Sequence, residues 1–344
     1  MLKFYDDTKI FVHCPAGMVT GGAELLHQLV SYLRRHGRDA YIIYFGEYEH
    51  IIPLDYSEYT IETTNSVEDT PHNIEIFYEG IFDMVSIHAK TQKFLWWISV
   101  DHFYHCAASY LHPCDLYKYD KKKGFYWFLV WMKRSILEHK NLFTGLLSIK
   151  KLAAMNAVSG YQAEYIQDFL LHHGFEEVVP LKDYINTDHC KSFNKTKKED
   201  IVLYNPSKGI EYTKSLMELA PDLQWIALKG LSRQQLILLL QKAKVYIDFG
   251  YHPGKDRLPR ECAMNGCCVI TGKRGSARFF EDVSIPPQYK FDEKKADKHE
   301  IISQIRWIMD NYTTAIDDYR YYRASISAEK NEFEAQINKI FDIC

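Results

Sequence analysis

The sequence lacks the patterns that mark several common classes of protein. Its eight cysteines form no C-x-x-C pair of the zinc or thioredoxin type. It contains no G-x-x-x-x-G-K-[ST], H-E-x-x-H or G-x-S-x-G motif. No apolar run approaches the ~20 residues of a membrane span. Because no signal-peptide pattern is present either, we expect a cytoplasmic protein with reduced cysteines.

An excess of charge of either sign is also missing. The 42 Lys and Arg residues nearly balance the 45 Asp and Glu residues, so the formal net charge is -3. A dedicated nucleic-acid-binding protein usually carries a basic excess, and we therefore expect no nucleic-acid partner. The 344 residues exceed what one typical core fills, which favours two domains of roughly 150 residues each.

Strand and helix patterns alternate along the chain. Near the start, an apolar strand at 10–14 is followed by a Gly-rich turn, a helical repeat of leucines over 25–33, and a second strand at 39–45. The same alternation begins again at 201. It predicts an α/β protein with two Rossmann-like, doubly wound domains facing a central cleft. We place the domains at 1–184 and 185–324, and expect a C-terminal helix at about 325–344 to pack back on the first.

The loops that follow the strands hold the candidate functional residues, because ligands of open α/β sheets bind at the carboxyl ends of strands. The richest segment begins at His252 and runs into a helix at Glu261, and a second Gly/basic loop follows at 273–275. A nucleotide diphosphate needs cations and free backbone N–H groups, and its ribose needs a carboxylate such as Glu261. The alternative is a solvated charged loop with a glutamate that caps the helix.

The segment P-R-E-C-A-M-N-G-C-C-V-I at 259–270 resembles the second half of the Glu-x7-Glu motif of GT-B glycosyltransferases, in particular the retaining, family 4-like group. This resemblance implies that Glu261 bonds the ribose of a nucleotide-sugar donor. It also implies that no metal or other cofactor is needed. Pro253 stands where the group has its first Glu. We expect His252 or Asp256 to take that place near the transferred sugar.

The resemblance extends over nearly the whole chain and implies further site residues in both domains. Lys208 of the segment Y-N-P-S-K-G is expected at the diphosphate. Asp101 and His102 are expected at the carboxyl end of a buried strand at 93–103, where His102 would face the donor sugar. The T-G-G-A-E segment with Gly21 and Gly22 resembles the Gly-rich loop that approaches the phosphates, but a Gly-Gly turn is common before helices. A His is likewise often structural, so these alternatives stay open for Gly21, Gly22 and His102. The candidate donor-binding residues are Gly21, Gly22, Lys208, Lys229, Lys255, Arg257, Arg260, Glu261 and Gly275. The candidate catalytic residues are His102, Asp101, His252 and Asp256.

The segment 121–134 interleaves lysines with aromatic residues. Such a pattern suits a peripheral membrane contact, whereas the alternative is a helix packed into the first domain.

The function expected from the resemblance is transfer of a hexose-type unit from a UDP- or GDP-linked sugar to a glycan or lipid-linked acceptor, in surface polysaccharide or glycoconjugate synthesis. Three alternatives stay open: a nucleotide-sugar epimerase on the same plan, a non-catalytic nucleotide-sugar-binding subunit, and a plain sugar-phosphate-binding protein.

Overall fold

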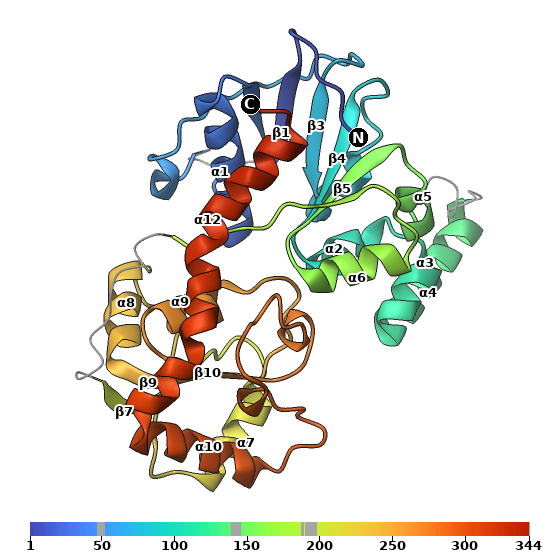
Figure 1. Ribbon diagram of the computed structural model, residues 1–344. Coiled ribbons are helices and arrows are strands. Elements are labelled where there is room, and N and C mark those ends of the chain that lie inside the picture. The colour runs from blue at the N-terminus through green and yellow to red at the C-terminus, as the bar shows by residue number, and fades with distance from the viewer. Residues whose placement is uncertain (47–51, 139–145, 187–188, 190–197, 344) are drawn as a thin grey trace. The chain divides into compact units, whose positions relative to one another are not determined.

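The computed structural model describes residues 1–46, 52–138, 146–186, 189 and 198–343, without the side chains of 134 and 138. It divides the chain into two compact units (Figure 1). The first unit comprises Met1–Gln162, Ile166–Leu181 and Glu334–Cys344, and the second comprises Ala163–Tyr165 and Lys182–Phe333.

The first unit contains a six-stranded parallel sheet in the order β2-β1-β3-β4-β5-β6. The strands are β1 (Lys9–Pro15), β2 (Asp39–Phe45), β3 (Ile74–Tyr78), β4 (Gln92–Trp97), β5 (Ala157–Tyr161) and β6 (Val178–Pro180). The helices are α1 (Gly21–Arg35), α2 (Val100–Cys106), α3 (Pro113–Tyr119), α4 (Lys121–Glu138), α5 (Ile149–Ala153) and α6 (Glu164–His172), whose first two residues belong to the second unit.

Helix α1 shows how the local sequence sets an element. Thr20 adopts an extended conformation and its side chain accepts a hydrogen bond from Ala23 N, as a helix N-cap does. Leu25, Leu29 and Leu33 then recur on one face and are completely or almost completely buried.

The second unit contains a four-stranded parallel sheet in the order β10-β9-β7-β8. The strands are β7 (Glu199–Tyr204), β8 (Gln224–Ala227), β9 (Ala243–Asp248) and β10 (Cys268–Thr271). The helices are α7 (Ile210–Leu219), α8 (Arg233–Lys242), α9 (Arg257–Met264), α10 (Lys298–Asp310) and α11 (Tyr312–Ala315). Helix α12 (Arg320–Ile340) starts in this unit and ends in the first. Val202, Val245 and Val269 from three adjacent strands are fully buried in the core.

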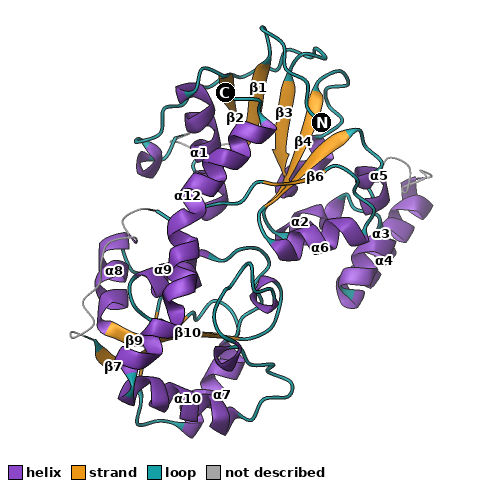
Figure 2. Ribbon diagram, viewed as in Figure 1, coloured by secondary structure: helices purple, strands orange, loops and turns teal. Residues whose placement is uncertain are grey.

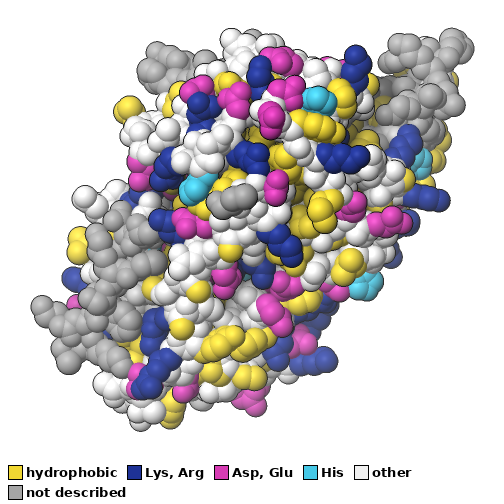
Figure 3. All heavy atoms as spheres, turned by 45° about the horizontal axis from the view of Figure 1, so that its top comes forward, with side chains coloured by type: hydrophobic (Ala, Val, Ile, Leu, Met, Phe, Trp, Pro, Cys, Tyr) yellow, Lys and Arg dark blue, Asp and Glu magenta, His cyan; other side chains and the backbone are white. Residues whose placement is uncertain are grey.

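Both sheets are parallel and are accompanied by helices in sequence between their strands, which confirms the α/β prediction (Figure 2). On the face drawn in Figure 3, basic and acidic side chains are intermixed, in keeping with the near-neutral net charge. Among the described residues, no helix combines the length and the apolar character needed to cross a lipid bilayer.

Candidate functional site

Two loops of the second unit lie against each other where β7 and β9 end. Gly209 has φ +66°, and a Cβ added there would lie 2.5 Å from the carbonyl carbon of Phe249. A Cβ on Gly250 would lie 2.4 Å from Cγ of Lys208. Side chains larger than hydrogen are therefore excluded at both positions, and the close approach directs Lys208 over the end of β9.

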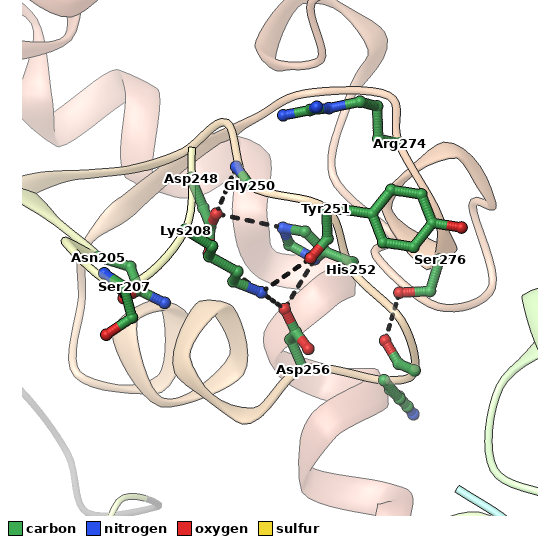
Figure 4. A network of polar contacts seen from close by, with 12 residues as sticks. Asn205, Ser207, Lys208, Asp248, Gly250, Tyr251, His252, Asp256, Arg274 and Ser276 are labelled. Atoms are coloured by element: carbon green, nitrogen blue, oxygen red, sulfur yellow. Dashed lines mark hydrogen bonds and ion pairs between the residues drawn. The ribbon is translucent and has the colours of Figure 1, made fainter. Parts of the chain in front are cut away.

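Lys208 is at the centre of a polar network formed by these loops (Figure 4). Its ammonium group contacts the carboxylate of Asp256, lies 3.8 Å from Oδ2 of Asp248 and donates to the carbonyl oxygen of Tyr251 at 3.4 Å. About a quarter of the Lys208 side chain is exposed.

His252 lies between the same two carboxylates. Its Nε2 is 3.5 Å from Oδ1 of Asp248 and its Nδ1 is 3.4 Å from Oδ2 of Asp256. The ring has no exposed surface, and this burial lowers the pKa of His252 although Asp248 acts in the opposite direction. The imidazole is therefore neutral at neutral pH.

Asp248 is a site residue that the sequence analysis missed. It accepts hydrogen bonds from the hydroxyl of Tyr246 at 2.8 Å and from Gly250 N at 2.9 Å. Burial raises the pKa of Asp248, but His252 and Lys208 outweigh it and lower the pKa to about 2. The available signal was a carboxylate that ends the otherwise apolar strand at 245–248.

The loop after β10 is joined to the same network. Ser276 N donates to the carbonyl oxygen of His252 at 2.9 Å, and Ser276 Oγ donates to that of Gly254 at 2.6 Å. Gly275 has φ +61°, and a Cβ there would lie 2.0 Å from the carbonyl oxygen of His252. Gly275 is therefore required for the contact between the two loops.

Arg260 and Lys255 belong to a different, buried ion cluster in the second unit. Arg260 has no exposed surface, and it donates to Glu329 Oε2 at 2.8 Å and to Asp183 Oδ2 at 2.9 Å. Lys255 Nζ is 2.8 Å from Glu329 Oε1. Burial raises the pKa of Asp183, but the charges of Arg260, Arg257 and Lys255 outweigh it, so the net pKa is lowered. The cluster connects the start of α9 to α12 and to the segment after β6.

The other donor-binding candidates of this unit lie around α9 and β8. Glu261 is mostly buried, with 14% of its side chain exposed, and its Oε1 is 3.8 Å from Nε2 of His189. Arg257 starts α9 with 23% of its side chain exposed, and its Nε is 3.9 Å from Asp183. Lys229 is exposed beyond the end of β8.

The first unit holds the remaining candidates. The expected place of Asp101 and His102 at the end of a strand is wrong: β4 ends at Trp97, and both residues lie in the first turn of α2. Ser99, two residues after the strand, is extended and caps this helix by accepting from His102 N. Gly21 and Gly22 open α1.

The imidazole of His102 has a partner on each nitrogen. Nδ1 is 3.0 Å from Oε1 of Glu79, and Nε2 is 3.3 Å from Sγ of Cys106. Hydrogen bonding to Cys106 and then to Glu79 raises the pKa of His102 to about 10. His102 is therefore an imidazolium at neutral pH, whose Nδ1–H donates to the Glu79 carboxylate. The neighbouring Asp101 accepts from the hydroxyl of Tyr119.

A metal could in principle use the ligand atoms of Asp248, His252 and Asp256, which lie within 4.8 Å of one another. Lys208 already supplies a positive charge to this group, in contact with Asp256. The residues present therefore suit an ammonium group better than a divalent ion, which would compete with it.

Comparisons with known proteins bear on the fold. No protein-family model matches the sequence, and no curated protein does. Among solved structures, the sucrose-phosphate synthase tll1590 of Thermosynechococcus elongatus matches with a TM-score of 0.64 at 11% identity, over 97% of this chain and 98% of that one. The lipopolysaccharide outer core galactosyltransferase WaaB matches with a TM-score of 0.63 at 10% identity, over 97% and 99%. Anabaena HepE in complex with UDP-glucose matches with a TM-score of 0.59 at 11% identity, over 97% and 99%.

The chain has the GT-B fold. The sequence resemblance to GT-B glycosyltransferases is thus confirmed at the level of the fold. Within this GT-B chain, the second unit brings together four of the predicted residues, Lys208, His252, Asp256 and Gly275, and adds Asp248. Arg260 and Lys255 are held in a separate cluster.

Proposed function

We propose that the protein transfers a hexose-type unit from a UDP- or GDP-linked sugar to a hydroxyl of a glycan or lipid-linked acceptor. The observation that carries the proposal is the partly exposed side chain of Lys208, whose ammonium group lies near Asp248 and Asp256 at the ends of β7 and β9. The fold supports it, because WaaB is named a galactosyltransferase and HepE was solved with UDP-glucose. A role in surface polysaccharide or glycoconjugate synthesis belongs to the same proposal.

Lys208 is the proposed partner of the donor diphosphate. Asp248 and Asp256 hold the ammonium before the donor binds, and phosphate oxygens then replace Asp256 as its partner. A cation at this point stabilises the charge that develops on the departing diphosphate. His252 is fully buried, with its Nδ1 at 3.4 Å from Oδ2 of Asp256, and we propose that it positions this carboxylate. We propose that no metal takes part, so chelation with EDTA should leave turnover unchanged. A loss of turnover with EDTA that is reversed by adding Mg²⁺ would contradict this.

Glu261 is the proposed acceptor of hydrogen bonds from the donor ribose. Calorimetry with UDP and GDP tests this role in the variant Glu261→Ala, with Glu218→Ala on an exposed face of α7 as the control. We expect donor binding to be lost only in Glu261→Ala. Unchanged affinity in that variant would refute the assignment.

The remaining donor-loop residues receive different roles. Arg260 and Lys255 have carboxylate partners inside the unit, and we propose that they fix α9 without touching the donor. Arg257 and Lys229 retain exposed surface and are proposed as additional diphosphate contacts. Gly275 acts through the contact of its loop with His252.

In the first unit, His102 is proposed to donate from Nε2–H to the donor sugar, in place of its contact with Sγ of Cys106. Its raised pKa makes it unsuited to the role of a general base at neutral pH. This agrees with a retaining reaction in which the acceptor hydroxyl attacks on the face of the leaving group and the diphosphate accepts the proton. Asp101 is proposed to orient the sugar. The backbone amides of Gly21 and Gly22 at the start of α1 are proposed to face the phosphates of the donor.

A non-catalytic nucleotide-sugar-binding subunit is the second candidate, because Pro253 stands at the position of the motif's first Glu. An assay with the donor alone and with donor plus an acceptor panel separates the two. Product that needs an acceptor supports the transferase. Donor binding without turnover supports the subunit, and conversion of the donor alone would indicate an epimerase.

A further inference from the structure

Helix α4 exposes a long apolar face. Phe125, Tyr126, Leu129, Ile136 and Leu137 are between 44% and 68% exposed, and Phe128 and Met132 are 41% and 43% exposed. Phe125, Leu129, Met132 and Ile136 recur every three or four residues, and Tyr126, Phe128 and Leu137 flank them on the same side of the helix. At 1.5 Å per residue, the face is about 18 Å long.

The opposite side of α4 is fixed to the first unit. A Cβ on Gly124 would lie 2.2 Å from the Cα of Tyr117, so α4 approaches α3 at backbone distance. Trp131, two turns further on, is only 7% exposed. The inward and outward sides are therefore distinct, and the exposed apolar residues do not come from a poorly packed helix.

The exposed charges described within α4 are basic, although the exposed Asp120 directly precedes the helix. Lys121, Lys122 and Lys133 are exposed, while the sequence of α4 contains no acidic residue before Glu138 at its last position. Lysines beside exposed aromatic and aliphatic side chains suit a surface with an apolar interior and anionic groups at its boundary.

We infer that the outward face of α4 docks on an anionic lipid bilayer surface, with its apolar side chains inserted among the acyl chains and its lysines at the headgroups. This inference does not depend on the proposed transfer reaction. A parallel pairing of α4 with a second copy of the chain would bring lysines of like charge together, and self-association is one of the outcomes that the test distinguishes.

Co-sedimentation of the full chain with lipid vesicles tests the inference. The vesicles contain phosphatidylcholine alone, or phosphatidylcholine and phosphatidylglycerol in equal amounts. We expect binding to the anionic vesicles only, and its loss when NaCl rises from about 0.1 M to about 1 M, which shortens the Debye length from about 10 Å to about 3 Å. Lys121→Gln/Lys122→Gln should bind about thirty-fold more weakly, at about 1 kcal/mol for each lysine.

Matched controls separate the face from general stickiness. Ile136→Ser/Leu137→Ser removes two apolar residues that are 68% and 67% exposed, and Ile87→Ser/Leu238→Ser removes two that are each 61% exposed elsewhere. We expect at least a ten-fold loss of vesicle binding in the α4 variant and none in the control. Equal binding by both variants, no binding by the unaltered chain, or self-association that disappears in the α4 variant would each overturn the inference.

Discussion

The ion cluster around Arg260 gives a prediction about stability that can be worked out from the structure. The guanidinium has no exposed surface and two buried carboxylate partners, Asp183 and Glu329. Replacing Arg260 by Met keeps most of the side-chain length but leaves the carboxylates with less compensation. Removing one partner of a buried pair costs about 3–5 kcal/mol.

Urea unfolding measures this cost. For an m-value of about 2 kcal/mol per molar, the transition of the second unit should fall by about 1.5–2.5 M. Hydrogen exchange of peptides from α9 assigns the change to that unit. The matched control is Arg306→Met, because Arg306 also makes two 2.8 Å bonds to a carboxylate, that of Asp222, but on the surface. An exposed pair contributes at most about 1 kcal/mol.

The two arginine variants test whether a buried arginine–carboxylate pair costs more to break than an exposed one. If Arg260→Met lowers the transition by no more than Arg306→Met does, the argument from the buried carboxylates is refuted. The same result would reopen a direct role of Arg260 at the donor.

Two further predictions concern the loops and the first unit. Gly275→Ala should weaken donor binding and lower stability by more than about 1 kcal/mol, because the new Cβ meets the His252 carbonyl oxygen. The control is Gly174→Ala, a position with positive φ but no atom within 4 Å of an added Cβ, and it should affect stability alone. Equal effects of the two variants on donor binding in calorimetry would contradict this. The pKa of His102 is raised from 6.5 to about 10, so its contribution to stability is fully present below about pH 6.5 and is lost as pH rises through about 10. The difference in urea midpoint between the unaltered chain and His102→Gln should therefore shrink over this range, and a difference that grows would contradict the assignment.

Much of the fold was predictable because the strand and helix patterns in the sequence agree with the strands and helices of the structure. Strands such as β1 and β9 are short apolar runs, and the start and end of α1 are marked by Thr20 and Gly37. The start of α2 was also visible in principle, since Ser99 is a good N-cap residue. It was missed because the apolar run before it suggested a longer strand.

The site was predictable only in part, because a sequence shows charge but not burial. Lys208, His252 and Asp256 lie on loops that could be recognised because each follows an apolar strand, and the three side chains do meet. The partners of Arg260 come from positions 69 and 77 residues away, and no local pattern indicates them. A basic residue in a strand-end loop therefore suggested a donor contact where the structure contains a buried ion pair.

Binding of nucleotides by Lys208 is the most direct test of the central claim. Calorimetric titration of UDP, GDP and their sugars is compared for the unaltered chain, Lys208→Met and the control Lys214→Met, whose side chain forms a surface pair with Glu211 on α7. One nucleotide class should bind, and Lys208→Met should weaken it about ten- to hundred-fold, as expected for a lost charge-assisted hydrogen bond of roughly 1.5–3 kcal/mol. The absence of nucleotide binding, or equal affinity in all three proteins, would contradict the account.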